Sequence, residues 1–197
     1  MSDRIQFYFD FVDPGSYLLH LQLKTLGVTS GSLSLIGIEM ALPPGEMIDP
    51  QAEDWKSYCD EMDQLAQRID RNIPKVGFVP WSRKAHELLL HAEASGAYSA
   101  VFDELFRAHF EDGKDLGRID VLTGIATESG LDYTETKAVL DVDKHTQALA
   151  TQRTEALQDG ITRIPTIRSG GESLVGPVGI NDLRTLFESP GGTTTGT

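Results

Sequence analysis

Asp13 and Ser16 are the residues whose types and spacing most directly suggest chemistry. They lie in the segment FYFDFVDPGSYLLH, residues 7–20, where a strand pattern breaks and a helix pattern starts. A carboxylate there could take a proton, the helix N-terminus would stabilise developing negative charge, and the hydroxyl could hydrogen-bond a substrate. A simpler interpretation stays open, because Asp is a preferred N-cap and Pro14 suits the first helical turn. Asp13 is therefore a helix cap, a ligand-binding residue or a general base.

Other reactive side chains give weaker signals. Cys59 is the only cysteine, which excludes an internal disulfide and every two-cysteine redox or zinc motif, and we interpret it as a packing residue. His109 follows the helical phase of Phe106 and Phe110, which favours a cleft or core histidine over a base. No metal site is predicted, because metal-ligand spacing is absent among the five histidines, at positions 20, 86, 91, 109 and 145.

The charge of the chain limits its partners. The 197 residues include 30 acidic and 17 basic ones, for a formal net charge of −13. Nucleic acid and anionic membrane surfaces would be repelled, so neither is an expected partner. The sequence has neither a run of about 18 apolar residues nor a signal-peptide pattern, and we expect a cytoplasmic protein.

Strand and helix patterns predict the elements that position Asp13. Residues 4–12 and 32–40 have strand patterns, and residues 16–26 between them form a leucine-rich helical face that ends at Gly27. Together they predict a β-α-β unit with parallel strands. From about residue 51 to residue 159 only helical patterns occur, including one pattern over residues 134–160.

The C-terminal part returns to strands. Residues 161–171 and 172–176 predict two short strands joined by a Ser-Gly-Gly turn, and residues 181–189 predict a closing helix. Neither strand-bearing piece has enough strands for a sheet of its own. We therefore predict an α/β protein, a thioredoxin-like fold with an inserted all-helical domain. The expected boundaries are residues 1–48 and 160–189 for the thioredoxin-like domain, 49–159 for the insertion and 190–197 for a disordered tail.

Four stretches resemble one family. FYFDFVDPGSYL, residues 7–18, resembles the start of the DsbA-like thioredoxin superfamily, and within it of the 2-hydroxychromene-2-carboxylate isomerases and kappa-class glutathione transferases. WSRKAHELLLHAEASG, ELFRAHFEDGKDLGRIDVLTGIATESGLD and GITRIPTIRSGGESLVGP, which start at residues 81, 104 and 160, resemble later parts of the same family.

This resemblance implies a set of site residues. It implies a cis peptide bond before Pro165, beside the helix that starts near Asp13, with backbone groups free to pair with an extended ligand. The implied ligand-contact residues are Tyr17, Trp81, Ser82, Ile164, Pro165 and Thr166. Ser82 has a structural alternative, as the N-cap of the helix that follows it.

The reactive positions depart from the family pattern. Asp13 and Ser16 match the two cysteines of the C-x-x-C motif, so dithiol exchange is excluded. The isomerase and kappa-class members carry serine at the first position and hold glutathione there. Asp13 would oppose a thiolate about 4 Å away by about 4 kcal/mol at an effective dielectric of about 20. The arginine of the family's G-x-D-R pattern is also missing from GPVGIND, residues 176–182. Glutathione is thus a disfavoured candidate cofactor.

Two functions are compatible with these observations. The first is a DsbA-family protein, of the thiol-disulfide oxidoreductase class, that has lost disulfide exchange and binds a peptide or small ligand at the cleft of Asp13, Ser16 and Pro165. The alternative is an enzyme like the isomerases or the glutathione transferases, in which Asp13 takes a proton. Either form is compatible with a homodimer.

Overall fold

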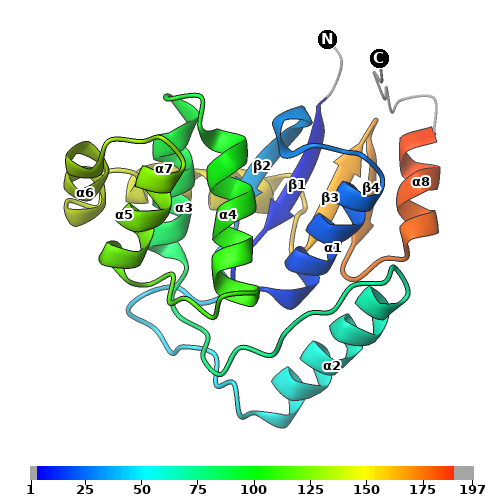
Figure 1. Cartoon of the computed structure of the whole chain (residues 1–197). Helices are drawn as coiled ribbons and strands as arrows, with labels where there is room; N and C mark the ends of the chain where they lie inside the picture. The colour runs from blue at the N-terminus through cyan, green and yellow to red at the C-terminus, as the bar shows by residue number, and fades with distance from the viewer. Residues whose placement is uncertain (1–3, 189–197) are drawn as a thin grey trace.

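A four-stranded mixed sheet lies at the centre of the molecule, in a computed structural model that describes residues 4–188 (Figure 1). The strand order is β2-β1-β3-β4. The central strand β1 (Ile5–Phe9) pairs in parallel with β2 (Leu33–Gly37) and antiparallel with β3 (Thr166–Ser169). The outer strand β4 (Glu172–Val175) pairs antiparallel with β3. The predicted β-α-β unit and the two later strands are confirmed, with shorter strands than expected.

The helices occupy three places around this sheet (Figure 1). Helix α1 crosses from β1 to β2, and α8 packs on the same face of the sheet as α1, beside β4. Helix α2 lies apart, across the end of the sheet at which α1 begins. The remaining helices form a bundle beside the sheet. Their bounds are α1 Pro14–Thr25, α2 Glu53–Gln67, α3 Arg83–Glu93, α4 Tyr98–Phe110, α5 Ile119–Glu128, α6 Tyr133–Asp141, α7 Thr146–Gln158 and α8 Ile180–Glu188, with a short 3-10 turn at Ser30–Ser32.

One helical prediction needs correction. The pattern over residues 134–160 is two helices, α6 and α7, and not one. Asp143 lies between them with a φ of 53°, a left-handed conformation that ends a helix and that Asp tolerates better than most residues. The predicted tail, residues 190–197, lies outside the described residues, and the domain boundaries stay a prediction.

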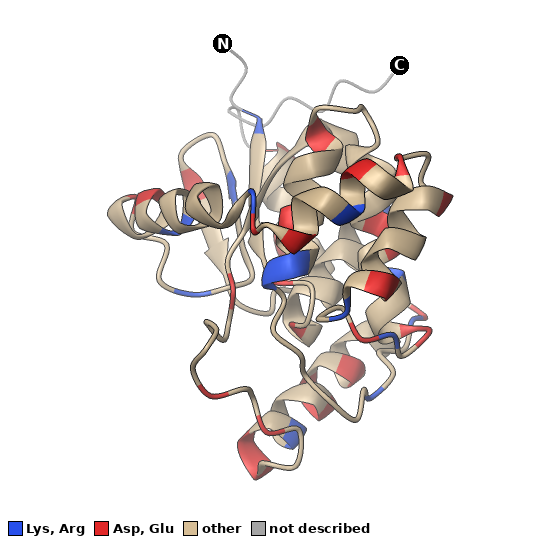
Figure 2. Ribbon diagram, turned by 90° about the vertical axis from the view of Figure 1, so that its left-hand side faces the viewer, with Lys and Arg blue, Asp and Glu red and all other residues tan. Residues whose placement is uncertain are grey.

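Acidic residues are spread over the outer surfaces of the helices and loops and do not gather in one place (Figure 2). Within residues 4–188, no helix is both long and apolar enough to cross a membrane. In the same range, no group of three or more His, Cys, Asp or Glu side chains is arranged to hold a metal ion.

Aromatic residues join the bundle to the sheet. Phe7, Phe9 and Phe11 alternate along β1 and its extension, and all three are fully buried. The Phe9 ring lies 4.9 Å from that of Phe11 and 5.1 Å from that of Phe102 on α4, in edge-to-face geometry. Tyr8 points to the opposite face and packs with Ala156 of α7. The strand that leads into Asp13 is therefore held from both sides.

His20 of α1 lies within this core and makes the stability of the protein pH-dependent. The side chain is 5% exposed and its ring stacks on Phe106. Burial, aided by the charge of Lys24, lowers the pKa of His20 to about 3. Since the unfolded chain takes up a proton near pH 6.5, stability is lost as the pH falls below that value.

We expect the wild type to lose about 1–2 kcal/mol more than His20→Gln between pH 7 and about pH 5. Urea unfolding at the two pH values, followed by circular dichroism, measures the difference. Equal losses in both proteins would show that His20 is not the group that titrates.

Candidate active site at the start of helix α1

Four hydrogen-bond donors converge on the Asp13 carboxylate at the start of α1. Oδ1 accepts from the Gly15 amide at 3.2 Å and from the Tyr58 hydroxyl at 2.7 Å. Oδ2 accepts from the Ser16 amide at 2.8 Å and from the Ser16 hydroxyl at 2.6 Å. Asp13 and Ser16 are both fully buried. Asp13 is thus the N-cap of α1, which confirms the cap interpretation.

Burial perturbs this carboxyl group. It raises the pKa of Asp13 above its ordinary value, although the hydrogen bonds from Ser16 and Tyr58 act in the opposite direction. Burial also raises the pKa of the Tyr58 hydroxyl, and the neighbouring Asp13 raises it further. The pair is an acid and a base in direct contact, an arrangement that can hold or transfer a proton.

Helix α2 covers the site through Tyr58. A Cβ atom at Gly15 would lie 2.2 Å from the Tyr58 hydroxyl oxygen and 3.0 Å from Pro165 Cδ. The absence of a side chain at Gly15 therefore allows α2 and the Pro165 loop to meet over the helix start. The Ile164–Pro165 peptide bond is cis, and so is that between Pro43 and Pro44. The structure thus brings Pro165 against the segment that holds Asp13 and Ser16.

Tyr58 is a site residue that the sequence analysis missed. Its only local signal is its spacing from Trp55 and Met62, which places the three on one face of α2. That spacing indicates a buried face but not the partner 45 positions away along the chain.

Two other predicted residues, Tyr17 and Thr166, have hydrogen-bond partners outside the Asp13 site, and Trp81 has none within residues 4–188. The Tyr17 hydroxyl donates to Glu111 at 2.8 Å, and its ring stacks on Phe110. The Thr166 hydroxyl donates to the Arg163 carbonyl oxygen at 2.7 Å. Trp81 is half-buried, and its indole nitrogen has no hydrogen-bond partner among residues 4–188.

Ser82 does not cap α3 as predicted. It occupies the N-cap position, but its side chain makes no capping hydrogen bond. The residue is 1% exposed and lies close enough to Asp10 to lower the pKa of that carboxyl group. The Ser82 Oγ has no hydrogen-bond partner within residues 4–188.

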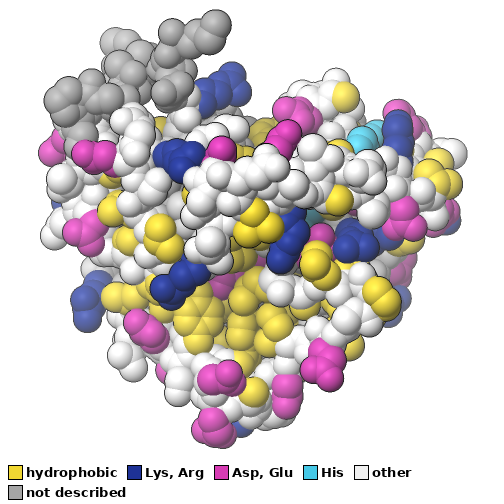
Figure 3. All heavy atoms as spheres, turned by 180° about the vertical axis from the view of Figure 1, so that it is seen from behind, with side chains coloured by type: hydrophobic (Ala, Val, Ile, Leu, Met, Phe, Trp, Pro, Cys, Tyr) yellow, Lys and Arg dark blue, Asp and Glu magenta, His cyan; other side chains and the backbone are white. Residues whose placement is uncertain are grey.

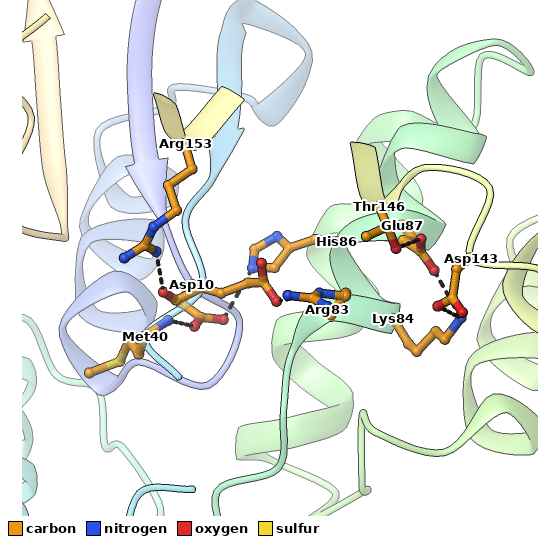
Figure 4. Close-up of polar contacts among 10 residues, drawn as sticks. Asp10, Met40, Arg83, Lys84, His86, Glu87, Asp143, Thr146 and Arg153 are labelled. Atoms are coloured by element: carbon orange, nitrogen blue, oxygen red, sulfur yellow. Dashed lines mark hydrogen bonds and ion pairs between the residues drawn. The ribbon is translucent and has the colours of Figure 1, made fainter. Parts of the chain in front are cut away.

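A second buried carboxylate, Asp10, lies behind the helix start and was also missed (Figure 4). Its Oδ2 accepts from the Met40 amide at 2.7 Å, and its Oδ1 lies 3.2 Å from His86 Nε2. Burial opposes the charged form, but the hydrogen bond and charge of His86 outweigh it and lower the pKa of Asp10. The Asp10 amide donates to the Ser16 hydroxyl at 3.2 Å. Ser16 therefore links the surroundings of both carboxylates.

Ion pairs extend this network into the bundle (Figure 4). Glu39, which follows β2, pairs with Arg83 of α3 at 2.9 Å, and its carbonyl oxygen accepts from Arg153 of α7 at 2.9 Å. Glu87 of α3 is fully buried and accepts from the Thr146 hydroxyl at 2.7 Å. These contacts hold α3 and α7 against the end of β2.

A groove lies beside this network and next to Pro165. It has a volume of about 180 Å³ and is bounded by the segment after β2, by α7 and by the loop of residues 161–164. Ile38, Ala156 and Ile161 provide apolar walls, while Arg153 and Arg163 provide charge. Seen from behind, hydrophobic side chains gather over the centre and lower part of this face (Figure 3). Met40 and Leu157, both on the groove, are 39% and 54% exposed.

A family model matches the whole described part of the chain. The family model described as the DSBA-like thioredoxin domain matches residues 4–188. The chain belongs to the DSBA-like thioredoxin domain family. The uncharacterized protein YwbO of Bacillus subtilis (strain 168) is 27% identical to this chain over 191 residues, which cover 91% of this chain and 92% of YwbO.

Solved structures agree with the family fold. A probable DsbA oxidoreductase of Streptomyces coelicolor, SCO1869, has a TM-score of 0.77 at 17% identity and covers 98% of this DSBA-like chain and 92% of its own. A 2-hydroxychromene-2-carboxylate isomerase has a TM-score of 0.72 at 19% identity, with 92% and 91% covered. The cytosolic disulfide reductase DsbM of Pseudomonas aeruginosa has a TM-score of 0.67 at 19% identity, with 87% of each chain covered. The predicted thioredoxin-like fold with added helices is confirmed.

Proposed function

We propose that this DSBA-like protein does not exchange disulfides and instead binds an extended peptide or a small apolar ligand beside Pro165. The observation that carries the proposal is the groove along Ile164, which joins apolar walls to the loop next to the buried Asp13 site. Asp13 and Ser16 are hydrogen-bonded to each other and fully buried, and neither of them lines the groove.

The backbone beside the groove supports an extended ligand. No backbone hydrogen bond of Ile164 is found within residues 4–188, whereas the next carbonyl, that of Pro165, accepts from Gly176 at 2.7 Å. Free backbone groups next to a strand can pair with an added segment of chain. Arg153 and Arg163 on the walls favour a ligand that also carries a negative charge.

The alternative is an isomerase-like or glutathione transferase-like enzyme. It is supported by the raised pKa of Asp13, which suits a general base, and by the similarity to an isomerase and to DsbM, which has also been solved with GSH. Against it, both oxygens of Asp13 already accept hydrogen bonds from Tyr58 and Ser16, and the charge of Asp13 would oppose a thiolate. For the location of the protein, we propose the cytoplasm, in line with the cytosolic DsbM.

Binding of an unfolded chain tests the proposal. The probe is reduced, carboxymethylated α-lactalbumin labelled with fluorescein, followed by fluorescence anisotropy. We expect the wild type to bind and Leu157→Asn, at the groove rim, to bind about tenfold more weakly, because it replaces an apolar wall with a polar side chain. Val142→Asn is the matched control, since Val142 is exposed and does not line the groove. Equal binding by both variants would contradict the groove assignment.

A calorimetric titration with reduced glutathione distinguishes the enzyme alternative from the proposed function. We expect no heat of binding for the wild type and a measurable heat for Asp13→Ser, which removes the charge that opposes a thiolate. Binding by the wild type that is lost in Ser16→Ala would establish a thiol-cofactor site and replace the proposed function.

A further inference from the structure

A pocket between α1 and α4 lies on the face of the sheet opposite to the groove beside Ile164. It has a volume of about 200 Å³ and is bounded by the second half of α1, by residues 27–30, by the start of β2 and by α4. Leu33 reaches this α1–α4 pocket from the sheet, whereas Ile38, on the other face, reaches the groove. The apolar walls of the pocket include Leu23, Leu33 and Phe102, and its polar groups include His20, Lys24 and Asp103.

A smaller pocket of about 150 Å³ adjoins the first along the same two helices. Both pockets are lined by His20, Lys24 and Asp103. Helices α1 and α4 stand side by side on the sheet and run in opposite directions, because Lys24 at the end of α1 meets Asp103, while Tyr17 at its start meets Phe110 (Figure 1). The three shared side chains therefore lie at the boundary between two open spaces.

His20 is a buried polar side chain without a hydrogen bond. It is 5% exposed, and its ring lies 5.3 Å from that of Phe102 and 5.1 Å from that of Phe106. Its Nε2 atom lies 3.9 Å from Asp103 Oδ1, which is too far for a hydrogen bond, and within residues 4–188 neither ring nitrogen makes one. Buried polar groups are seldom left without a partner, so the His20 ring has an unused donor and acceptor at the pocket.

Asp103 faces His20 and also lacks a hydrogen bond. Its side chain is half-buried, and Oδ1 has no hydrogen-bond partner in the described part of the chain. The Lys24 ammonium lies 3.8 Å from Oδ2, which is an ion-pair distance and not a hydrogen bond. Burial raises the pKa of Asp103, although Lys24 and the nearby Ser30 act in the opposite direction. A donor that entered the pocket would satisfy this carboxylate.

We infer that the α1–α4 pocket binds a small uncharged molecule with a hydroxyl group and an apolar body, such as a phenol or a short alcohol. A hydroxyl is both a donor and an acceptor, so it can donate to the Asp103 carboxylate and also hydrogen-bond the His20 ring. The apolar body lies against the walls formed by Leu23 and Phe102.

The charges and the size of the pocket support an uncharged, small ligand. Lys24 and Asp103 carry opposite charges, so a cation would compete with Lys24 and an anion would face the Asp103 carboxylate. The volume lies below the range of about 300–1,000 Å³ that is usual for sites of drug-sized ligands. Since the pocket shares no residue with the groove beside Ile164, this site is independent of the proposed function.

Titrations followed by ¹⁵N–¹H NMR test the inference. The probes are p-cresol, toluene, which lacks the hydroxyl, and benzoate, which is an anion. We expect saturable shifts of the Gly27, Val28 and Asp103 amides with p-cresol, and about tenfold weaker binding of toluene and of benzoate. Toluene or benzoate that binds as well as p-cresol would overturn the ligand class. Shifts with p-cresol that do not saturate, or that fall elsewhere, would overturn the site.

Variants of Asp103 locate the binding. Asp103→Ala should weaken binding of p-cresol about tenfold, and Asp103→Asn, which keeps one acceptor oxygen, should recover part of the loss. Asp141→Ala is the matched control, because Asp141 is an exposed helical residue that pairs with Lys137 on α6, away from the pocket. The ¹⁵N–¹H spectrum of each variant shows whether it is folded. Equal binding by Asp103→Ala and Asp141→Ala would overturn the proposal.

Discussion

The Asp10→Asn variant should be less stable than the wild type by about 2–3 kcal/mol at neutral pH, because it leaves a buried hydrogen-bond partner of the carboxylate unsatisfied. Asp10 is fully buried and holds His86 of α3 and the Met40 amide at the same time. Asn can replace only one of its two acceptor oxygens. Urea unfolding followed by circular dichroism measures the loss, and a loss no larger than that of the exposed Asp120→Asn would contradict the assignment.

The difference in stability between the wild type and Asp10→Asn should depend on pH. The pKa of Asp10 is lower in the folded protein than the ordinary value of 3.8. Its contribution is therefore complete above pH 3.8 and is lost as the pH falls below it.

A substitution at Gly37 tests the Asp10–His86 contact from the side of His86, because a Cβ at Gly37 would lie 2.2 Å from His86 Nδ1. Gly37→Ala should therefore displace His86 and destabilise the protein as well, by about 1–3 kcal/mol.

Asp13→Ala should cost about 2–4 kcal/mol. The change removes an N-cap, worth about 1 kcal/mol, and it leaves buried donors at Gly15, Ser16 and Tyr58 without an acceptor. Asp13→Ser keeps one acceptor oxygen and should recover part of the loss. Unfolding in urea measures both variants. If Asp13→Ala and Asp13→Ser were equally stable, the side-chain oxygen would not be the stabilising group.

Asp13 should respond to pH in the opposite sense to Asp10. Burial raises its folded pKa above 3.8, so its favourable contribution is present below that pH and is lost as the pH rises through the folded value. The advantage of the wild type over Asp13→Ala should therefore grow on acidification, while its advantage over Asp10→Asn shrinks. Two carboxylates separated by three positions along the chain then serve as controls for each other.

The local features of the fold were predictable from the sequence. The Asp13-Pro14-Gly15-Ser16 segment has both cap and helix-start residues, and the alternating aromatic residues of β1 indicate a strand. Helix α7 was merged with α6 because a left-handed residue such as Asp143 has no distinct pattern within a polar helical stretch. Local spacing therefore predicted the helices and strands, but it did not show where α6 ends and α7 begins.

The polar contacts of the site depend on residues far apart in the sequence. Asp10 meets His86 across 76 positions, and Tyr58 meets Asp13 across 45. Asp10 does interrupt an otherwise apolar run from Phe7 to Val12, and that interruption was the available signal. A charged residue within such a run requires a buried partner. The sequence could indicate that need, but only the packing of α3 on the strand end identifies His86.

The hydroxyl of Tyr58 over Gly15 has a consequence for the affinity of ligands. Asp13 is fully buried and its Oδ1 is bonded to Tyr58, so a molecule reaches that atom only after Tyr58 moves away. The measured affinity of any molecule for Asp13 would then equal its intrinsic affinity multiplied by the fraction of protein with Tyr58 displaced. Because Tyr58 donates to Asp13 at 2.7 Å, Tyr58→Phe would enlarge that fraction, and every such ligand would gain the same factor in affinity.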